Sequence, residues 1–127
     1  MDKYKARLIA QGFTQIYRVD YFEMFSPVAK LSSFCPILAL AVHFDWDAEC
    51  FDFNGAYLNG ELNDNEEIYM YSPPGYDTDR NTVKQLCKLL YGLKQAGRKW
   101  YETLLRALAD LGFSVSQADL GVVHRLH

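Results

Sequence analysis

Six short stretches of the chain have the composition or the alternation of β-strands: residues 4–11, 50–53, 67–71, 83–90, 113–116 and 120–126. Successive side chains of a strand point to opposite faces of a sheet. Lys5 and Arg7 therefore share one face of the first stretch, where they suit either a phosphate chain or solvent. Aromatic residues favour a half-buried pleated surface, so we predict a short, largely buried strand over residues 50–53.

One helix is predicted to begin after Ser32 or Ser33, with a serine as its N-cap and Pro36 in its first turn. Residues 37–42 are apolar on every side, which is typical of a helix that is buried on most of its surface. His43 follows this apolar body. We interpret it as a partner of the helix dipole at the C-terminal end rather than as a catalyst.

A second helix is predicted over residues 95–111, and Gly112 is a natural C-terminal stop. Its apolar positions follow the i, i+4, i+7, i+8, i+11 spacing of one helix face: Trp100, Leu104, Ala107, Leu108 and Leu111. Arg98, Glu102 and Arg106 form an i, i+4 ladder on another side. This is the clearest element of the sequence.

The remaining stretches connect these elements. Residues 13–30 have no regular period, and we predict an irregular, packed connector whose aromatic residues fill a core: Phe13, Tyr17, Tyr21, Phe22 and Phe25. Residues 61–65 and 72–82 are predicted loops. At 127 residues the chain is long enough for one domain with its own core. Together the patterns predict an α+β fold, a mixed or antiparallel sheet packed against two main helices.

Composition is that of an ordinary globular protein, with 50% hydrophobic and 23% charged residues. The longest apolar run, residues 35–44, is about half of what a membrane span requires, and the N-terminus lacks the apolar core of a signal peptide. Cys35, Cys50 and Cys87 are far apart in the sequence and show no metal-ligand spacing. We predict that each is reduced and in the core of an intracellular protein, cytoplasmic or nuclear and not secreted.

Charge is unevenly distributed along the chain, although the net charge is only -3. Residues 41–79 contain ten acidic side chains and no Lys or Arg, whereas residues 80–106 contain seven basic side chains and one acidic one. Such segregation can focus a field on a charged ligand. It is equally compatible with solvated faces that happen to cluster.

Asp52 stands at the end of the apolar stretch 50–53, just before Asn54-Gly55. A carboxylate in that position is costly unless something compensates it. One compensation is a hydrogen bond that caps the following turn, a common role of Asp beside Asn-Gly. The other is a hard cation, which needs only one or two protein carboxylates when a substrate phosphate supplies further oxygen ligands.

Four blocks of the sequence, in this order and at this spacing, resemble the reverse transcriptase of copia-type LTR retrotransposons. They are Lys-Ala-Arg-Leu-Ile-Ala-Gln-Gly-Phe at 5–13, Phe-Ser-Pro-Val-Ala-Lys at 25–30, Phe-Asp-Phe-Asn-Gly-Ala-Tyr-Leu-Asn-Gly-Glu-Leu at 51–62, and Ile-Tyr-Met through Pro-Pro-Gly at 68–75 with Leu-Tyr-Gly-Leu-Lys-Gln at 90–95. The resemblance covers nearly the whole chain. It implies a partial right-hand polymerase fold, with the fingers and part of the palm in a single truncated domain over residues 1–127.

The same resemblance implies roles for individual residues. Asp52 matches the first metal-binding aspartate, which holds Mg²⁺ between enzyme and nucleotide, and the carbonyl of Phe53 matches a further ligand. Two such ions, ~3.5–4 Å apart, would stabilise the attacking 3′-hydroxyl and the leaving pyrophosphate. Tyr57 matches the aromatic residue that excludes a ribose 2′-hydroxyl. Lys5 and Arg7 lie in the strand that supplies triphosphate contacts.

Three further residues belong to the block at 90–95. Tyr91 and Gly92 match the segment beside nucleotide and template, and Lys94, like Arg98, is placed to approach nucleic-acid phosphates. The implied partners are a dNTP and an RNA or DNA template-primer, with no membrane.

The sequence also departs from the family. Asn54-Gly55 replaces the usual Lys-Asn type of pair, Ala96-Gly97 stands where Ser-Pro is commoner, and residues 1–127 contain no Tyr-x-Asp-Asp motif, the source of the other two metal carboxylates. We therefore expect no polymerase activity from this chain alone. Two other interpretations stay open, a non-catalytic nucleic-acid-binding remnant and a chain that does not stay folded because a palm strand has an unpaired edge.

Overall fold

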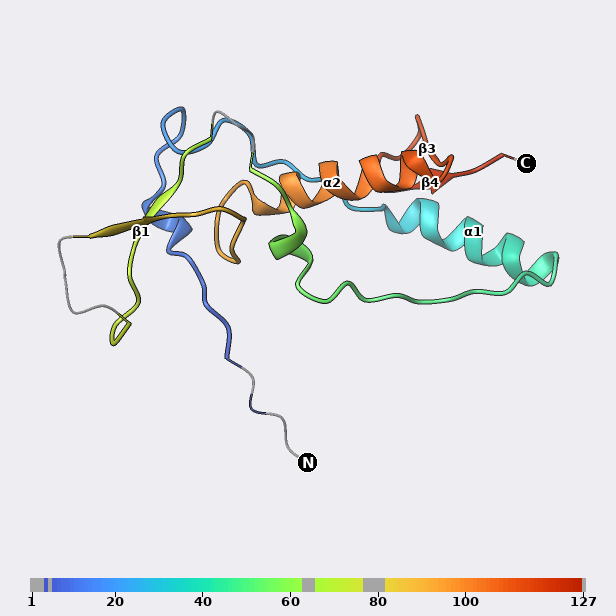
Figure 1. Ribbon diagram of the computed structural model, residues 1–127. Coiled ribbons are helices and arrows are strands. Elements are labelled where there is room, and N and C mark those ends of the chain that lie inside the picture. Colours follow the sequence, from blue (N-terminus) through green and yellow to red (C-terminus); the bar gives the residue numbers. More distant parts are fainter. Residues whose placement is uncertain (1–3, 5, 63–65, 77–81, 127) are drawn as a thin grey trace.

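The computed structural model describes residues 4, 6–62, 66–76 and 82–126 (Figure 1). Within these residues it has two α-helices, two short antiparallel hairpins and two 3₁₀ turns. The elements, in chain order, are η1 (Gly12–Thr14), α1 (Leu31–His43), η2 (Ala56–Asn59), β1 (Tyr69–Tyr71), β2 (Val83–Gln85), α2 (Ala96–Asp110), β3 (Ser114–Val115) and β4 (Val123–His124). The predicted α+β class is confirmed.

Helix α2 agrees with the prediction from its periodicity. It spans Ala96–Asp110 and ends where Gly112 takes a left-handed backbone with φ 84°. The Gly112 N–H donates to the carbonyl oxygen of Ala109 at 2.9 Å, and the Phe113 N–H donates to that of Leu108 at 3.0 Å. This pair of bonds is the Schellman motif, which satisfies the last carbonyls of a helix and needs glycine at the turn.

The strands pair as two separate hairpins rather than as one sheet. Tyr69 of β1 lies opposite Gln85 of β2, and Val115 of β3 lies opposite Val123 of β4. Both hairpins fall within predicted stretches, but each strand is only two or three residues long. Residues 6–11 of the predicted first strand form a single bridge, between Ile9 and Tyr91; Lys5 lies outside the described residues.

Helix α1 begins earlier than predicted, at Leu31, so Pro36 lies inside the helix and the predicted serine cap is wrong. The position of the cap is held by Lys30, whose N–H donates to Oδ2 of Asp119 at 2.8 Å. Asp119 is 5% exposed and also accepts a hydrogen bond from the Ser33 side chain. The start of α1 is thus capped by a carboxylate from a distant turn.

The hydrogen bond from Ser33, together with those from the N–H groups of Lys30 and Gly121, lowers the pKa of Asp119 from 3.8 to about 2. The same turn packs closely on the start of α1. A Cβ added to Gly121 would collide with the backbone of Ala29. Glycine is therefore required where this turn meets the residue before the helix.

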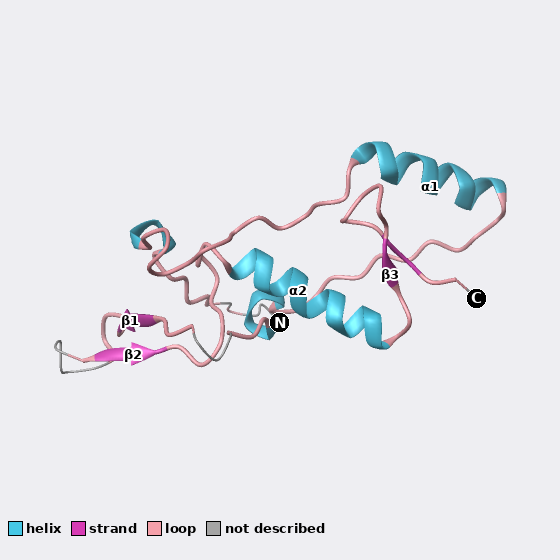
Figure 2. Ribbon diagram, turned by 90° about the horizontal axis from the view of Figure 1, so that it is seen from above, coloured by secondary structure: helices cyan, strands magenta, loops and turns pink. Residues whose placement is uncertain are grey.

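Helix α1 is exposed, which contradicts the prediction that it is buried on most sides. Its apolar side chains Phe34 and Val42 are 52% and 84% exposed, and none of its residues is buried. In the described part of the chain it contacts no other helix or strand. Figure 2 shows α1 standing apart from α2.

Residues 44–55 run back in an extended path from the far end of α1 to η2 (Figure 1). The predicted buried strand over residues 50–53 is wrong, because these residues are exposed and have no strand beside them among the described residues. A β-strand is completed only by the backbone of a neighbour, and the alternation of side chains cannot supply that neighbour.

The core is small and lies at the opposite end of the molecule from the exposed helix. It is formed by Ile68, Leu89, Leu93 and Ala96. The three cysteines are all exposed, so their predicted place in the core is wrong. Of the connector 13–30, the irregular path is confirmed but the packed aromatic core is not, since Phe13, for example, is 79% exposed. None of the helices in the described residues has both the length and the apolar character of a membrane span.

Candidate functional site

Three of the predicted site residues meet at one place although they are far apart in the sequence. The guanidinium carbon of Arg7 lies 4.8 Å from the ring centroid of Tyr91. The rings of Tyr57 and Tyr91 meet edge to face, with centroids 4.9 Å apart and an angle of 63° between their planes. Tyr91 thus makes a cation–π contact with Arg7 and an edge-to-face contact with Tyr57, and both contacts are attractive.

Backbone contacts hold Arg7 and Tyr91 in register. The Ala10 N–H donates to the carbonyl oxygen of Tyr91 at 2.8 Å. Beside this bond Gly92 has a left-handed backbone with φ 91°, and a Cβ at Gly92 would collide with the carbonyl oxygen of Ala10. A Cβ at Gly12 would in turn collide with the carbonyl oxygen of Gly92. The two glycines let the segments approach closely enough for the side chains to meet.

The turn after residue 53 places Tyr57 in this cluster. Gly55 has a left-handed backbone with φ 65° at the start of η2, and its carbonyl accepts the Leu58 N–H at 2.8 Å. The Asn59 side-chain amide donates to the carbonyl oxygens of Asn54 and Gly55 at 3.4 and 3.3 Å. The Asn54-Gly55 departure from the family pattern is thus built into a turn that suits these two residues.

Asp52 is exposed and has no hydrogen-bond or ion-pair partner among the described residues. The predicted cost of burying its carboxylate therefore does not arise, and the turn is capped by Asn59 instead. Phe53, the next residue, packs edge to face on Trp100, with centroids 5.1 Å apart. This contact fixes the end of the extended segment against α2. Asp52 lines neither the cleft between residues 8–20 and 68–74 nor the one between residues 26–29 and 100–123.

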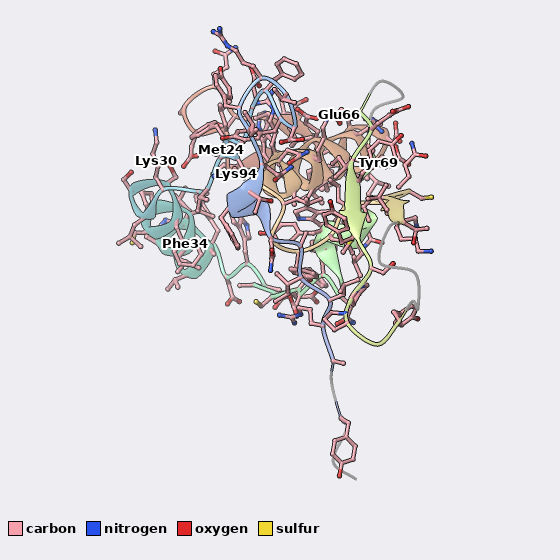
Figure 3. All side chains as sticks on the ribbon, turned by 90° about the vertical axis from the view of Figure 1, so that its left-hand side faces the viewer. Met24, Lys30, Phe34, Glu66, Tyr69 and Lys94 are labelled. Carbon is pink, nitrogen blue, oxygen red and sulfur yellow. The ribbon has the colours of Figure 1, made fainter. Side chains whose placement is uncertain are left out.

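Lys94 lies outside the three-residue cluster, where the N-terminal segment passes the start of α2 (Figure 3). Its backbone N–H donates to Oε1 of Gln15 at 2.8 Å. Its ammonium nitrogen lies 5.7 Å from the ring centroid of Tyr21. Neither Lys94 nor Arg7 has a carboxylate partner among the described residues.

The cations of α2 are paired with acidic side chains. The pairs are Arg98 with Glu23 at 2.7 Å and with Glu102 at 2.8 Å, Lys99 with Glu66 at 3.1 Å, and Arg106 with Glu61 at 3.2 Å. Two of the carboxylates, Glu61 and Glu66, come from the acidic stretch 41–79. Two of the ten acidic side chains of that stretch are thus paired with cations of α2. Arg98, predicted to approach phosphates, is already neutralised by two carboxylates.

The described residues do not fit a complete metal site. Nowhere among them do three or more His, Cys, Asp or Glu side chains gather as ligands. Mg²⁺ requires near-octahedral oxygen geometry, usually from one or two carboxylates, a substrate phosphate and water. Asp52 offers one such carboxylate, and the carbonyl of Phe53 follows it. These atoms suit one edge of a metal site and cannot close it.

Several residues that hold the site together carry no recognisable signal in the sequence. Gln15 and Tyr21 lie in the irregular connector, whose lack of period hides their contacts with Lys94. Gln95 lies in the block at 90–95 but was not singled out, and it is 2% exposed. Trp100 was predicted only as part of an apolar helix face. The sequence indicated that Phe53 and Trp100 are aromatic but not that their rings would be in contact.

Comparison with known proteins gives a consistent result. A protein-family model described as reverse transcriptase (RNA-dependent DNA polymerase) matches residues 1–127. The chain is 46% identical to the retrovirus-related Pol polyprotein from transposon RE1 of Arabidopsis thaliana and 45% identical to that from transposon RE2, each over 98% of this chain. It is 46% identical to the Pol polyprotein from transposon TNT 1-94 of Nicotiana tabacum, over 78% of this chain.

The matched region is a small part of each relative. The chain spans 9% of the length of the two Arabidopsis polyproteins and 8% of that from tobacco. No solved structure matches the chain.

Proposed function

Because the chain belongs to the reverse transcriptase family and is similar to Pol polyproteins of plant copia-type retrotransposons, we propose that it forms the nucleotide-facing part of an RNA-directed DNA polymerase. The observation that carries this proposal is the meeting of Arg7, Tyr57 and Tyr91. Each was singled out from the sequence for a nucleotide contact. They come from three separate segments, and only folding brings them together.

The cluster supports a division of roles at the nucleotide. Arg7 supplies a positive charge that no described carboxylate neutralises, which suits a triphosphate. Tyr57 presents its ring beside Tyr91, where a bulky wall would reject a ribose 2′-hydroxyl. Tyr91 and Gly92 form the floor beside nucleotide and template. Lys5, outside the described residues, stays a candidate for a second triphosphate contact.

Reverse transcriptases generally use a divalent metal ion, and we propose Mg²⁺ for this one. Asp52 and the carbonyl of Phe53 would hold one edge of the ion's site, supported by the contact between Phe53 and Trp100. The ion would supply positive charge to the reacting phosphate. Because residues 1–127 lack the other carboxylates, we propose that this chain alone does not extend a primer.

The proposed fold is the fingers and part of the palm of a right-hand polymerase, in one domain over residues 1–127. The exposed helix α1 and the unpaired segment 44–55 support it, since both are what a palm would leave uncovered without the rest of its sheet. The proposed partners are a template-primer of RNA or DNA and a dNTP, with the reaction inside the cell, in cytoplasm or nucleus.

A chimera tests this function. Residues 4–126 replace the matching segment of an active Pol polyprotein relative, and primer extension on poly(rA)–oligo(dT) is measured with dUTP and with UTP. We expect Tyr57→Val to raise the relative efficiency of UTP at least about tenfold, because the wall against the 2′-hydroxyl is removed. Tyr76→Val, an exposed tyrosine outside the cluster, is the matched control.

Two results would reject the function. One is unchanged discrimination between UTP and dUTP in Tyr57→Val, and the other is full activity in Asp52→Asn. The isolated chain is assayed in parallel; incorporation above a no-enzyme control, lost on Asp52→Asn, would refute its proposed inactivity.

A second candidate function is a non-catalytic nucleic-acid-binding remnant. The observation in its favour is that Arg7 and Lys94 lie on aromatic rings rather than on carboxylates. Binding of a labelled oligonucleotide would then weaken linearly on a log–log plot against salt, with a slope set by the number of phosphate contacts. Binding to the isolated chain, with no activity in the chimera, would favour this function over the first.

A further inference from the structure

Lys94 is held at both ends by the same loop. Gln15 accepts its backbone N–H at 2.8 Å, and the ring of Tyr21 lies beneath its ammonium group, 5.7 Å from nitrogen to centroid. The two residues are six positions apart in the connector 13–30; one contacts the backbone of Lys94 and the other the tip of its side chain. A flexible lysine normally has many rotamers. Here both its root and its charged tip have a defined partner.

A chain of amide hydrogen bonds locks this loop in place. The Gln15 side-chain NH₂ donates to Oε1 of Gln95 at 3.1 Å, and the Gln95 NH₂ donates to the carbonyl oxygen of Asp20 at 3.1 Å. Gln95 is 2% exposed. Each amide therefore uses both its oxygen and its nitrogen, which fixes its orientation. This chain of hydrogen bonds runs from the Lys94 N–H through the side chains of Gln15 and Gln95 to the carbonyl oxygen of Asp20, the residue before Tyr21.

The partner of the Lys94 ammonium differs in kind from those of α2. Arg98, Lys99 and Arg106 face carboxylates, which cancel their charge. An aromatic ring attracts a cation through its quadrupole and leaves the net positive charge in place. Lys94 is thus ordered but not neutralised, which is the state that a phosphate-binding cation requires.

We propose that Gln15, Tyr21 and Gln95 form a cradle that positions the Lys94 ammonium for a phosphate group, on either nucleic acid or a nucleoside triphosphate. Lys94 makes the contact, while Gln15, Tyr21 and Gln95 are positioning residues. The inference rests on the proposed function, because it assumes a phosphate-bearing ligand. It adds to that function three residues whose own side chains need not touch the ligand.

The geometry of the cradle is tested first, without any ligand. In NMR spectra of the 127-residue chain, ring current from Tyr21 should shift the Lys94 ε-methylene protons upfield of the other lysines. The shift should vanish in Tyr21→Leu and in Gln15→Ala and persist in Tyr76→Leu, whose ring lies elsewhere and is exposed. Thermal melts confirm that each variant is folded. No upfield shift in the unaltered chain would overturn the cradle.

Its role is tested by a double-mutant cycle on binding of labelled oligo(dT) and, separately, of dTTP. Lys94→Ala should weaken oligo(dT) binding and reduce the salt slope by about 0.7, the value for one lost phosphate contact to a single strand. Gln15→Ala should give a reduction of the same sign. The double variant should lose no more than Lys94→Ala alone, because Gln15 acts through Lys94. Gln117→Ala, on an exposed turn, is the control.

The outcomes separate the two proposals. Additive losses from Gln15→Ala and Lys94→Ala would overturn the cradle and leave the polymerase assignment standing. A slope unchanged in Lys94→Ala, or no binding of either ligand by a chain that shows the upfield shift, would overturn the phosphate role of Lys94. The chimera then decides independently whether the polymerase function also fails. An effect on dTTP alone, or on oligo(dT) alone, identifies which phosphate Lys94 meets.

Discussion

The region around Leu89 and the helix α1 both contain runs of apolar residues, yet the first is buried and the second is exposed. Leu89 is fully buried and packs in a core with Ile68, Leu93 and Ala96. Helix α1 has an apolar body, yet its residues are exposed and it stands apart from α2. Figure 3 shows Phe34 on this helix and Lys30 at its start. The difference is that Ala10 and Tyr57, from two distant segments, pack against the first region, whereas α1 has no contact with another helix or strand among the described residues.

Burial in this chain depends on close approach by distant backbone and not on local hydrophobicity. In the compact region that approach is made by Gly12 and Gly92, where no Cβ fits. At α1 the close approach is confined to the start of the helix, where Gly121 lies against Ala29 and Asp119 accepts the Lys30 N–H. Beyond its first turn, α1 has no contact with another helix or strand among the described residues.

The largest effect is expected from breaking the close approach itself. In Gly92→Ala the new Cβ would collide with the carbonyl oxygen of Ala10, and the backbone at φ 91° disfavours a side chain. We expect a loss of about 3 kcal/mol or more in the free energy of unfolding. Gly75→Ala is a matched control, because φ is +85° there but nothing lies within 4 Å of the added Cβ. Equal losses in the two variants, measured by urea unfolding, would show that backbone strain and not the collision matters.

The next largest effect distinguishes the two regions directly. Leu89→Ala should cost about 2–5 kcal/mol of unfolding free energy, because it leaves a cavity in the core. Leu40→Ala removes the same atoms from α1, where the side chain is 46% exposed, and should cost under about 1 kcal/mol. Similar losses in the two variants would mean that α1 is buried in solution.

A smaller effect is expected at the start of α1, where Asp119 accepts the Lys30 N–H. Asp119→Asn should lower the Tm by a few degrees, because a neutral amide accepts hydrogen bonds from Lys30 and Ser33 more weakly. The pH dependence has a fixed sign. Since the pKa of Asp119 is lowered from 3.8 to about 2 on folding, its stabilisation is present above about pH 4 and is lost as the pH falls through about 2.

The measurement for Asp119 is a set of thermal melts between pH 2 and 7. The difference in Tm between the unaltered chain and Asp119→Asn should shrink toward the acid end. Asp110→Asn, an exposed carboxylate at the end of α2, is the control and should show no such trend. A difference that stays constant with pH would contradict the ionised cap.

The smallest effect on stability is expected on the surface of α1. Replacing Leu31 and Val42, which are 73% and 84% exposed, by Gln should change the free energy of unfolding by less than about 0.5 kcal/mol. The same change should reduce self-association, because exposed apolar side chains drive aggregation. Sedimentation velocity measures this. A large loss of stability would instead show that α1 packs on something in solution.

Local signals in the sequence were sufficient for some elements. The 3.6-residue period and Gly112 fix α2 to within a residue at each end, because a helix makes its bonds within itself and the Schellman turn needs glycine. The hairpins were predicted in the right places but too long. Strand length depends on how far two segments stay paired, which neither segment reveals alone.

Contacts between residues far apart in the chain could not be predicted from the sequence pattern. No pattern indicated that the cap of α1 comes from Asp119, and the expected serine cap was wrong for that reason. At the candidate site, the resemblance indicated Arg7, Tyr57 and Tyr91, whose meeting the structure shows. The roles proposed for them at a nucleotide stay predictions. The role of Gln15 could not be predicted, because an irregular segment has no periodic pattern that indicates which way a side chain points.

The cap supplied by Asp119 also has a bearing on how the protein is made. Eighty-nine residues separate Lys30 from the carboxylate that receives its N–H. Residues 31–43 are synthesised well before Asp119, so the Lys30 N–H at the start of α1 lacks this partner until then. The Lys30 N–H can gain this partner only after residue 119 has been synthesised, so the capping of α1 follows the synthesis of the helix itself.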